Sequence, residues 1–181
     1  MPFAGSYANI ILFRRGKCDK IKEKGGKTMN LWEEARNIEV QTSDDIVGGF
    51  SIGFDKQIPE ETKDELTRFA YWVEDNYNLP VTLWVDFKYK HYLVNRDKQR
   101  VGYKFYWVDF DSFPVFDNWD DLPVIELPVR TEDWTMEEIL ASFIEAITCY
   151  FAWLTGRMTE GYEPDPDLVE QILQTYLKEN A

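Results

Sequence analysis

The sequence has few of the residues that proteins use to bind metals or to activate nucleophiles. Its 181 residues include one histidine, His91, and two cysteines, Cys18 and Cys149. A protein zinc site usually draws on several His or Cys ligands. The cysteines lie far apart in the sequence, and Cys149 falls in a predicted buried helix, so free thiols are favoured over a disulfide. The composition therefore predicts no bound metal and no other cofactor.

Long apolar runs are also absent. A membrane-spanning helix needs about 20 consecutive apolar residues, and no segment of the sequence approaches that length. The short apolar segment 7–13 lacks the basic start and the small-residue cleavage site of a signal peptide. We therefore expect a cytoplasmic protein that does not contact a membrane.

Basic residues are outnumbered by acidic ones. The sequence has 20 Lys and Arg against 33 Asp and Glu, which gives a formal net charge of −13. Affinity for nucleic acids comes largely from Lys and Arg that displace counterions from phosphates, so the sequence predicts no nucleic-acid binding. Acidity of this degree leaves open that the protein imitates nucleic acid toward a basic partner, although acidic surfaces most often serve solubility alone.

The basic residues are concentrated at the start of the chain. Residues 1–28 carry seven Lys and Arg against Asp19 and Glu23. The segment Lys24 to Gly26 can be encoded by a bacterial ribosome-binding sequence just upstream of Met29. We therefore expect residues 1–28 to be a non-native or flexible leader, and residues 29–181 to form a single domain.

Hydrophobic periodicity predicts a helix and two strands in the first half of this domain. Residues 58–77 have apolar residues at helical spacing, and Pro59 suits the start of the helix. Residues 81–89 alternate between apolar and polar, as a half-buried strand does, and residues 101–110 form a second strand. The polar turn at residues 95–100 predicts that the two strands form an antiparallel hairpin.

A third strand is predicted at residues 122–129, followed by two helices. Pro123 and Pro128 cannot donate ladder hydrogen bonds, so we expect this strand at an edge of the sheet. A capping-box pattern opens a helix that covers residues 138–154, and Asp165 opens the last helix. This order predicts an α+β fold with a small, mostly antiparallel sheet and helices packed on one side.

The helix predicted at residues 138–154 is apolar over most of its circumference, which indicates a buried, central position. Its one narrow stripe of small or polar side chains consists of Ser142, Glu145, Cys149 and Ala152, at spacings of three, four and three residues. Burial of a lone carboxylate costs on the order of several kcal/mol unless it is paired or hydrated. We therefore expect Glu145 to face a cleft, a cation or a hydrogen-bond donor.

Residues 139–153 resemble the active-site helix of small zincin metallopeptidases of the minimal gluzincin type, in which a comparable apolar helix carries His-Glu-x-x-His. The preceding helix, aromatic hairpin and edge strand are similar to that family in their order. The resemblance implies a zincin-like fold in which Glu145 and Cys149 stand at the two histidine positions. It places Ala146 at the catalytic glutamate, and Glu170 is a possible match to the third metal ligand.

The chemistry of a zincin is missing at these positions. In that family two imidazoles hold the metal and a carboxylate takes the proton from metal-bound water. A chain with one histidine cannot restore this pattern in any register. The resemblance therefore implies relict positions and no catalytic residues. A metal site made of Glu145, Cys149 and Glu170 is an alternative. More commonly, a cysteine such as Cys149 is a small buried apolar residue, and a glutamate such as Glu145 is a structural hydrogen-bond acceptor.

Aromatic side chains are concentrated in the second predicted strand. Tyr103, Phe105 and Trp107 share one face of it, because side chains alternate along a strand. Such rows most often belong to a hydrophobic core, and a surface for a ligand or partner is the less common alternative.

We expect a binding cleft that combines Ser142, Glu145 and Cys149 with Val124 and Glu126 of the predicted edge strand. In active zincins that strand pairs with the substrate peptide. The first hypothesis is a non-catalytic pseudo-peptidase that binds a peptide or protein partner. The alternatives are an enzyme of unrecognised type that uses carboxylates around Glu145, and an acidic inhibitor that imitates nucleic acid.

Overall fold

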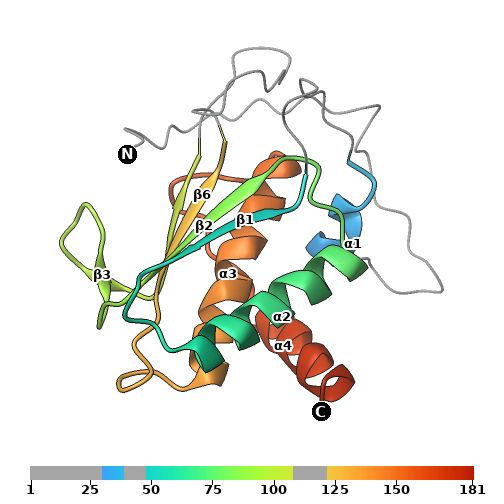
Figure 1. The fold of residues 1–181 in the computed structure, drawn as a ribbon. Helices are drawn as coiled ribbons and strands as arrows, with labels where there is room; N and C mark the ends of the chain where they lie inside the picture. The colour runs from blue at the N-terminus through green and yellow to red at the C-terminus, as the bar shows by residue number, and fades with distance from the viewer. Residues whose placement is uncertain (1–29, 39–47, 108–121) are drawn as a thin grey trace.

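The structure is a computed structural model that describes residues 30–38, 48–107 and 122–181 (Figure 1). The expected leader, residues 1–28, lies outside these ranges, as do residues 108–110 of the second predicted strand. The elements are α1 (Leu31–Ala35), β1 (Phe50–Phe54), α2 (Glu60–Asn76), β2 (Leu83–Lys88), β3 (Leu93–Val94), β4 (Arg100–Val101), β5 (Lys104–Tyr106), β6 (Val124–Pro128), α3 (Met136–Leu154) and α4 (Pro166–Glu179).

The strands form a four-stranded sheet in the order β1-β2-β6-β5 and a separate two-stranded ladder of β3 and β4. The α+β class is confirmed, but the prediction of a mostly antiparallel sheet was wrong. The pairs β1–β2 and β2–β6 are parallel, and only β5–β6 is antiparallel. Helix α2 connects β1 to β2, and a parallel pair requires a crossover of this kind.

The predicted antiparallel hairpin between residues 81–89 and 101–110 was also wrong. Strand β2 lies between β1 and β6 and does not pair with β4 or β5. The polar turn joins the short strands β3 and β4 instead, where the side chain of Asn95 accepts a hydrogen bond from the backbone N–H of Gln99 at 2.9 Å. The turn was predicted correctly. The residues of a turn do not determine how many residues of the flanking strands pair with each other.

Strand β6 corresponds to the third predicted strand, yet it lies inside the sheet. Pro123 precedes β6, and its carbonyl accepts from the N–H of Trp84 at 3.1 Å. Pro128 is the last residue of β6, and the next residue, Val129, donates to the carbonyl of Lys88 at 2.9 Å. The prolines stand at the two ends of the strand and so leave the ladder between them intact.

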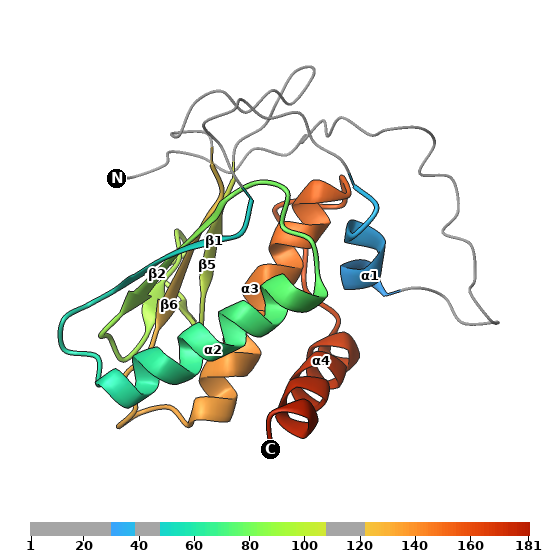
Figure 2. The ribbon, with the colours of Figure 1, turned by 45° about the vertical axis from the view of Figure 1, so that its right-hand side comes forward.

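The four helices lie on one face of the four-stranded sheet, as predicted (Figure 2). Helix α3 packs against β5 and β6, and α1 and α4 pack in turn against α3. Both predicted helix starts are confirmed. Thr135 and Glu138 form the reciprocal capping box of α3, and the side chain of Asp165 accepts from the N–H of Asp167 at 3.0 Å. No helix in the described part of the chain is long and apolar enough to cross a membrane.

Two buried polar side chains attach α3 to its surroundings. The hydroxyl of Tyr150 donates to the carbonyl of Val81 at 2.6 Å and accepts from the N–H of the same residue at 3.1 Å. The hydroxyl of Thr148 accepts from the indole N–H of Trp32 in α1 at 2.9 Å. These bonds satisfy buried polar groups and connect α3 both to the segment that enters β2 and to α1.

We expect Tyr150→Phe to lower the free energy of unfolding by roughly 1–3 kcal/mol, because both main-chain groups of Val81 lose a buried partner. Urea denaturation measures the change. Tyr71→Phe is the matched control, since Tyr71 is 63% exposed on α2. Equal stabilities of the two variants would contradict this account of how α3 is held.

Candidate functional site

The polar stripe of α3 lies beneath β5 and the residues that lead into it. A Cβ atom at Gly102 would lie 3.1 Å from the Oγ of Ser142, so the chain there passes close to the helix. The hydroxyl of Tyr103 lies 3.7 Å from the Sγ of Cys149. Glu145 stands on the same stripe between these two contacts. The structure thus brings Ser142, Glu145 and Cys149 together on one side of α3, as predicted from their spacing.

Cys149 is buried, and its thiol is poorly suited to act as a nucleophile. Its side chain is 2% exposed, and burial raises the pKa of the thiol to about 12, even though contact with the hydroxyl of Tyr103 acts in the opposite direction. Nucleophilic catalysis requires a thiolate and a base that activates it. The sole histidine, His91, lies 3.1 Å from the carboxylate of Asp133 and contacts that acid instead of Cys149. The thiol therefore stays protonated at neutral pH.

Glu145 is half-buried and carries the only carboxylate of the stripe. Burial raises the pKa of its carboxyl group. The negative charge of Glu145 also helps to raise the pKa values of Tyr103 and Cys149, after the larger effect of burial. Among the described residues, no salt bridge or hydrogen bond to its carboxylate was found. The stripe thus contains a carboxyl group that has no counter-charge among the described residues.

The other positions implied by the zincin resemblance do not join this stripe. Ala146 is fully buried in the core. Glu170 is exposed on α4, where its carboxylate accepts from the side-chain amide of Gln174 at 2.9 Å. Within residues 30–38, 48–107 and 122–181, no three His, Cys, Asp or Glu side chains are grouped closely enough to hold a metal ion. The alternative of a metal site at Glu145, Cys149 and Glu170 therefore finds no geometric support.

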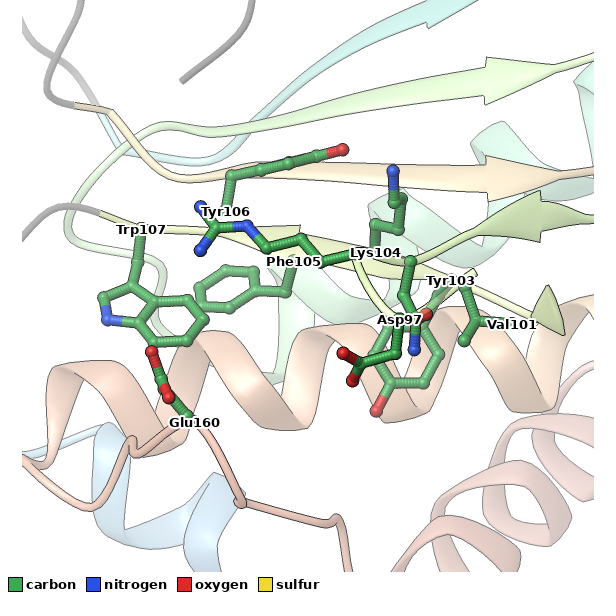
Figure 3. Close-up of a pocket in the computed structure, with 10 residues that line it drawn as sticks. Asp97, Val101, Tyr103, Lys104, Phe105, Tyr106, Trp107 and Glu160 are labelled. Atoms are coloured by element: carbon green, nitrogen blue, oxygen red, sulfur yellow. The ribbon is translucent and has the colours of Figure 1, made fainter. Parts of the chain in front are cut away.

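The predicted cleft is divided by the sheet. Ile125 and Leu127 of β6 are fully buried on the helix side, so the alternating Val124 and Glu126 point to the opposite face. Glu126 is in register with Lys104, whose side chain also points away from α3 (Figure 3). Val124 and Glu126 consequently do not line one cleft with Glu145. The prediction failed because Val124 and Glu126 alternate with Ile125 and Leu127 and so lie on the face of the sheet away from α3.

A groove instead follows the edge of the sheet at β5, the last strand in the sheet order (Figure 3). Its volume is about 410 Å³, and it is open to solvent. The turn between β3 and β4 forms one end, and the connection between α3 and α4 contributes Glu160. The lining residues are Asn95, Arg96, Asp97, Val101, Tyr103, Lys104, Phe105, Tyr106, Trp107 and Glu160.

The aromatic row predicted from the sequence lies on the α3 side of β5. The rings of Phe105 and Trp107 stack with centroids 5.7 Å apart and an interplanar angle of 16°. Trp107 is 5% exposed, and its indole N–H has no hydrogen-bond partner among the residues that the structure describes. A buried donor without an acceptor costs roughly 1–3 kcal/mol. A ligand that displaces the groups covering this N–H and supplies an acceptor would remove that cost.

Charge is distributed unequally between the two sides of the groove. Asp97 and Glu160 lie on the α3 side, with the carboxylate of Glu160 beneath the indole of Trp107 (Figure 3). Lys104 lies on the other side, with its ammonium group 5.6 Å from the ring centroid of Tyr106. Neither Asp97 nor Glu160 forms a salt bridge within the described part of the chain.

Comparisons with models of known protein families, with curated proteins and with solved structures gave no match to this chain. The site is therefore interpreted from its own geometry. The sequence indicated the aromatic row at residues 103–107 but not the groove, because Glu160 is distant from that row in the sequence and the fold alone brings it there. The alternation of Phe50, Ile52 and Phe54 was a signal for β1 that the prediction did not use.

We expect Glu145→Gln to have a higher free energy of unfolding than the wild type at pH 7. Because the pKa of Glu145 is raised in the folded protein, its carboxyl group supports the fold fully below its ordinary pKa of 4.5 and loses that contribution as the pH rises through the raised value. The difference between the two proteins should therefore shrink as the pH falls toward 4.5.

Urea denaturation at a series of pH values measures this difference. Glu163→Gln is the control, since Glu163 is exposed in the connection between α3 and α4. If Glu145→Gln is instead less stable than the wild type at pH 7, the account is wrong. Glu145 then serves as a structural hydrogen-bond acceptor whose charge is stabilised by a partner.

Proposed function

We propose that the protein is a non-catalytic binding protein that holds an extended polypeptide segment in the groove along β5. One observation carries the proposal: the buried indole N–H of Trp107 lacks an acceptor in an aromatic groove at the edge of a sheet. A polypeptide supplies carbonyl acceptors at regular intervals. It can also pair with the main chain of an edge strand, a recurring mode of peptide recognition.

The position of β5 supports a polypeptide as the ligand. Its antiparallel neighbour β6 uses the main-chain groups on one side only, so the groups on the other side point toward the groove. β5 contains no proline, unlike β6, and therefore retains all its N–H donors. The β3–β4 turn and Glu160 line the same groove along this edge.

The chemistry of the α3 stripe supports a role without catalysis. The thiol of Cys149 is protonated and buried, and Ala146 occupies the position that the resemblance assigns to a general base. A hydrolase of the zincin kind needs a metal-bound water and a carboxylate that accepts its proton. No observation favours the alternative of an enzyme that uses Glu145, because the neighbouring thiol of Cys149 is buried and its pKa is raised to about 12.

A zincin-like origin forms part of the same proposal. The order of α2, the sheet, α3 and α4 supports it, as do the packing of α3 on the sheet and of α4 on α3. In this pseudo-peptidase, β5 takes the place that the resemblance assigned to β6, because β5 and not β6 lies at the edge. The polar stripe beneath β5 then represents the former catalytic surface.

Peptide selection followed by direct binding tests the proposal. We expect a phage-displayed library of short random peptides to yield ligands that bind the full chain. Trp107→Phe keeps the aromatic stack but removes the N–H donor, so it should weaken binding roughly 2- to 10-fold, the value of one hydrogen bond. Isothermal calorimetry with a selected synthetic peptide measures the effect.

Trp72→Phe is the matched control for this substitution. The indole of Trp72 donates to Glu179 at 2.6 Å, away from the groove, so the control removes a donor without changing the site. A library that yields no ligand, or ligands that bind wild type and Trp107→Phe equally, would refute the proposed function.

A further inference from the structure

We propose that the segment bound along β5 carries basic side chains at alternate positions, with these side chains directed toward the α3 side of the groove. The inference rests on the proposed function, since it specifies the chemistry of the polypeptide that occupies the same groove. It follows from where the uncompensated carboxylates lie and from the geometry of an added strand.

Three carboxylates on the α3 side form no salt bridge in the described structure, although Arg96 directly precedes Asp97 and also lines the groove. Asp97 and Glu160 line the groove, and Glu145 lies on α3 near Tyr103, which also lines it. The one basic residue in the connection that carries Glu160 is Arg157, and its guanidinium already binds the buried carboxylate of Glu34 at 2.8 Å. A basic ligand would supply compensating charge at this side of the groove.

The groove itself contains two cations, Arg96 and Lys104. Lys104 points to the opposite side of β5 from Asp97 and Glu160, above the ring of Tyr106 (Figure 3). A strand added to β5 directs successive side chains to opposite faces of the sheet. Basic side chains at every second position of the ligand then face the carboxylates. The ligand residues between them lie on the same side as Lys104 and are neutral or acidic.

Contacts with aromatic rings and long-range electrostatic attraction also favour a ligand with basic side chains. The ring of Tyr103 and the stacked rings of Phe105 and Trp107 can contact the alkyl part of a Lys or Arg side chain and attract its charge. The net charge of −13 attracts basic partners over a distance and accelerates their association at low salt. The donor of Trp107 binds a main-chain carbonyl of any peptide, so the carboxylates determine which peptide is preferred.

Two labelled decapeptides of identical composition test the pattern. In one, Lys and Thr alternate; in the other, all Lys residues precede all Thr residues. We expect the full chain to bind the alternating peptide roughly three- to tenfold more tightly, since only alternation places every Lys toward the carboxylates. Fluorescence anisotropy at low and at physiological salt measures both affinities.

Variants of the chain separate this inference from the proposed function. Asp97→Asn and Glu160→Gln should reduce the preference for the alternating peptide, whereas Glu163→Gln, an exposed control outside the groove, should preserve it. Trp107→Phe should weaken both peptides by the same factor and leave the preference unchanged.

The outcomes are distinct. A preference that depends on Asp97 and Glu160 supports the inference. If both peptides bind equally and Trp107→Phe weakens both, the inference is wrong and the proposed function stands. Tighter binding of a decapeptide in which Glu alternates with Thr overturns the inference in the same way. If no decapeptide binds and peptide selection also yields no ligand, the proposed function itself is wrong.

Discussion

The burial of α3 between the sheet and the other helices is the constraint on which the rest of the structure depends. Every residue from Ala146 to Leu154 is buried, so polar groups on this helix need partners inside the core. Tyr150 and Thr148 find them in the segment before β2 and in α1. Only the stripe of Ser142, Glu145 and Cys149 lies where the core meets the edge of the sheet, under β5.

This arrangement leaves two unfavourable features on the α3 side of β5. The carboxyl group of Glu145 is half-buried without a partner in the described structure, and the N–H of Trp107 is buried without an acceptor. The buried Oε1 of Glu34 and Nε of Arg130 also lack hydrogen bonds, but each of them takes part in a salt bridge. Unfavourable local features that stability alone would remove are typical of functional sites. Their position beside an open strand edge agrees with a site that a polypeptide completes.

Much of the local structure could be predicted from the sequence. The capping box at Thr135, the start of α4 at Asp165 and the apolar pattern of α2 are local signals, and all three were confirmed. The stripe on α3 also followed from helical spacing alone. The raised pKa of the Cys149 thiol follows mainly from its burial, which depends on contacts with residues distant in the sequence.

The pairing of the strands could not be predicted in the same way. Pro123 and Pro128 suggested an edge strand, but they stand at the ends of β6, where the ladder tolerates them. The parallel position of β2 depends on β1 and on the crossover through α2, both of which involve contacts between distant residues. Because β6 is internal, β5 became the edge, and the groove gathered Asp97 and Glu160 from separate parts of the chain. The expectations of a cytoplasmic protein without nucleic-acid binding stay predictions.

The central claim is that the main chain of β5 receives the ligand, and amide hydrogen exchange of the full chain tests it most directly. Exchange is followed by mass spectrometry with and without a saturating peptide from the library selection. The account predicts slower exchange in fragments that cover Lys104–Tyr106, with little change in α1 or α2. Unchanged exchange at β5, with protection at another surface, would contradict it.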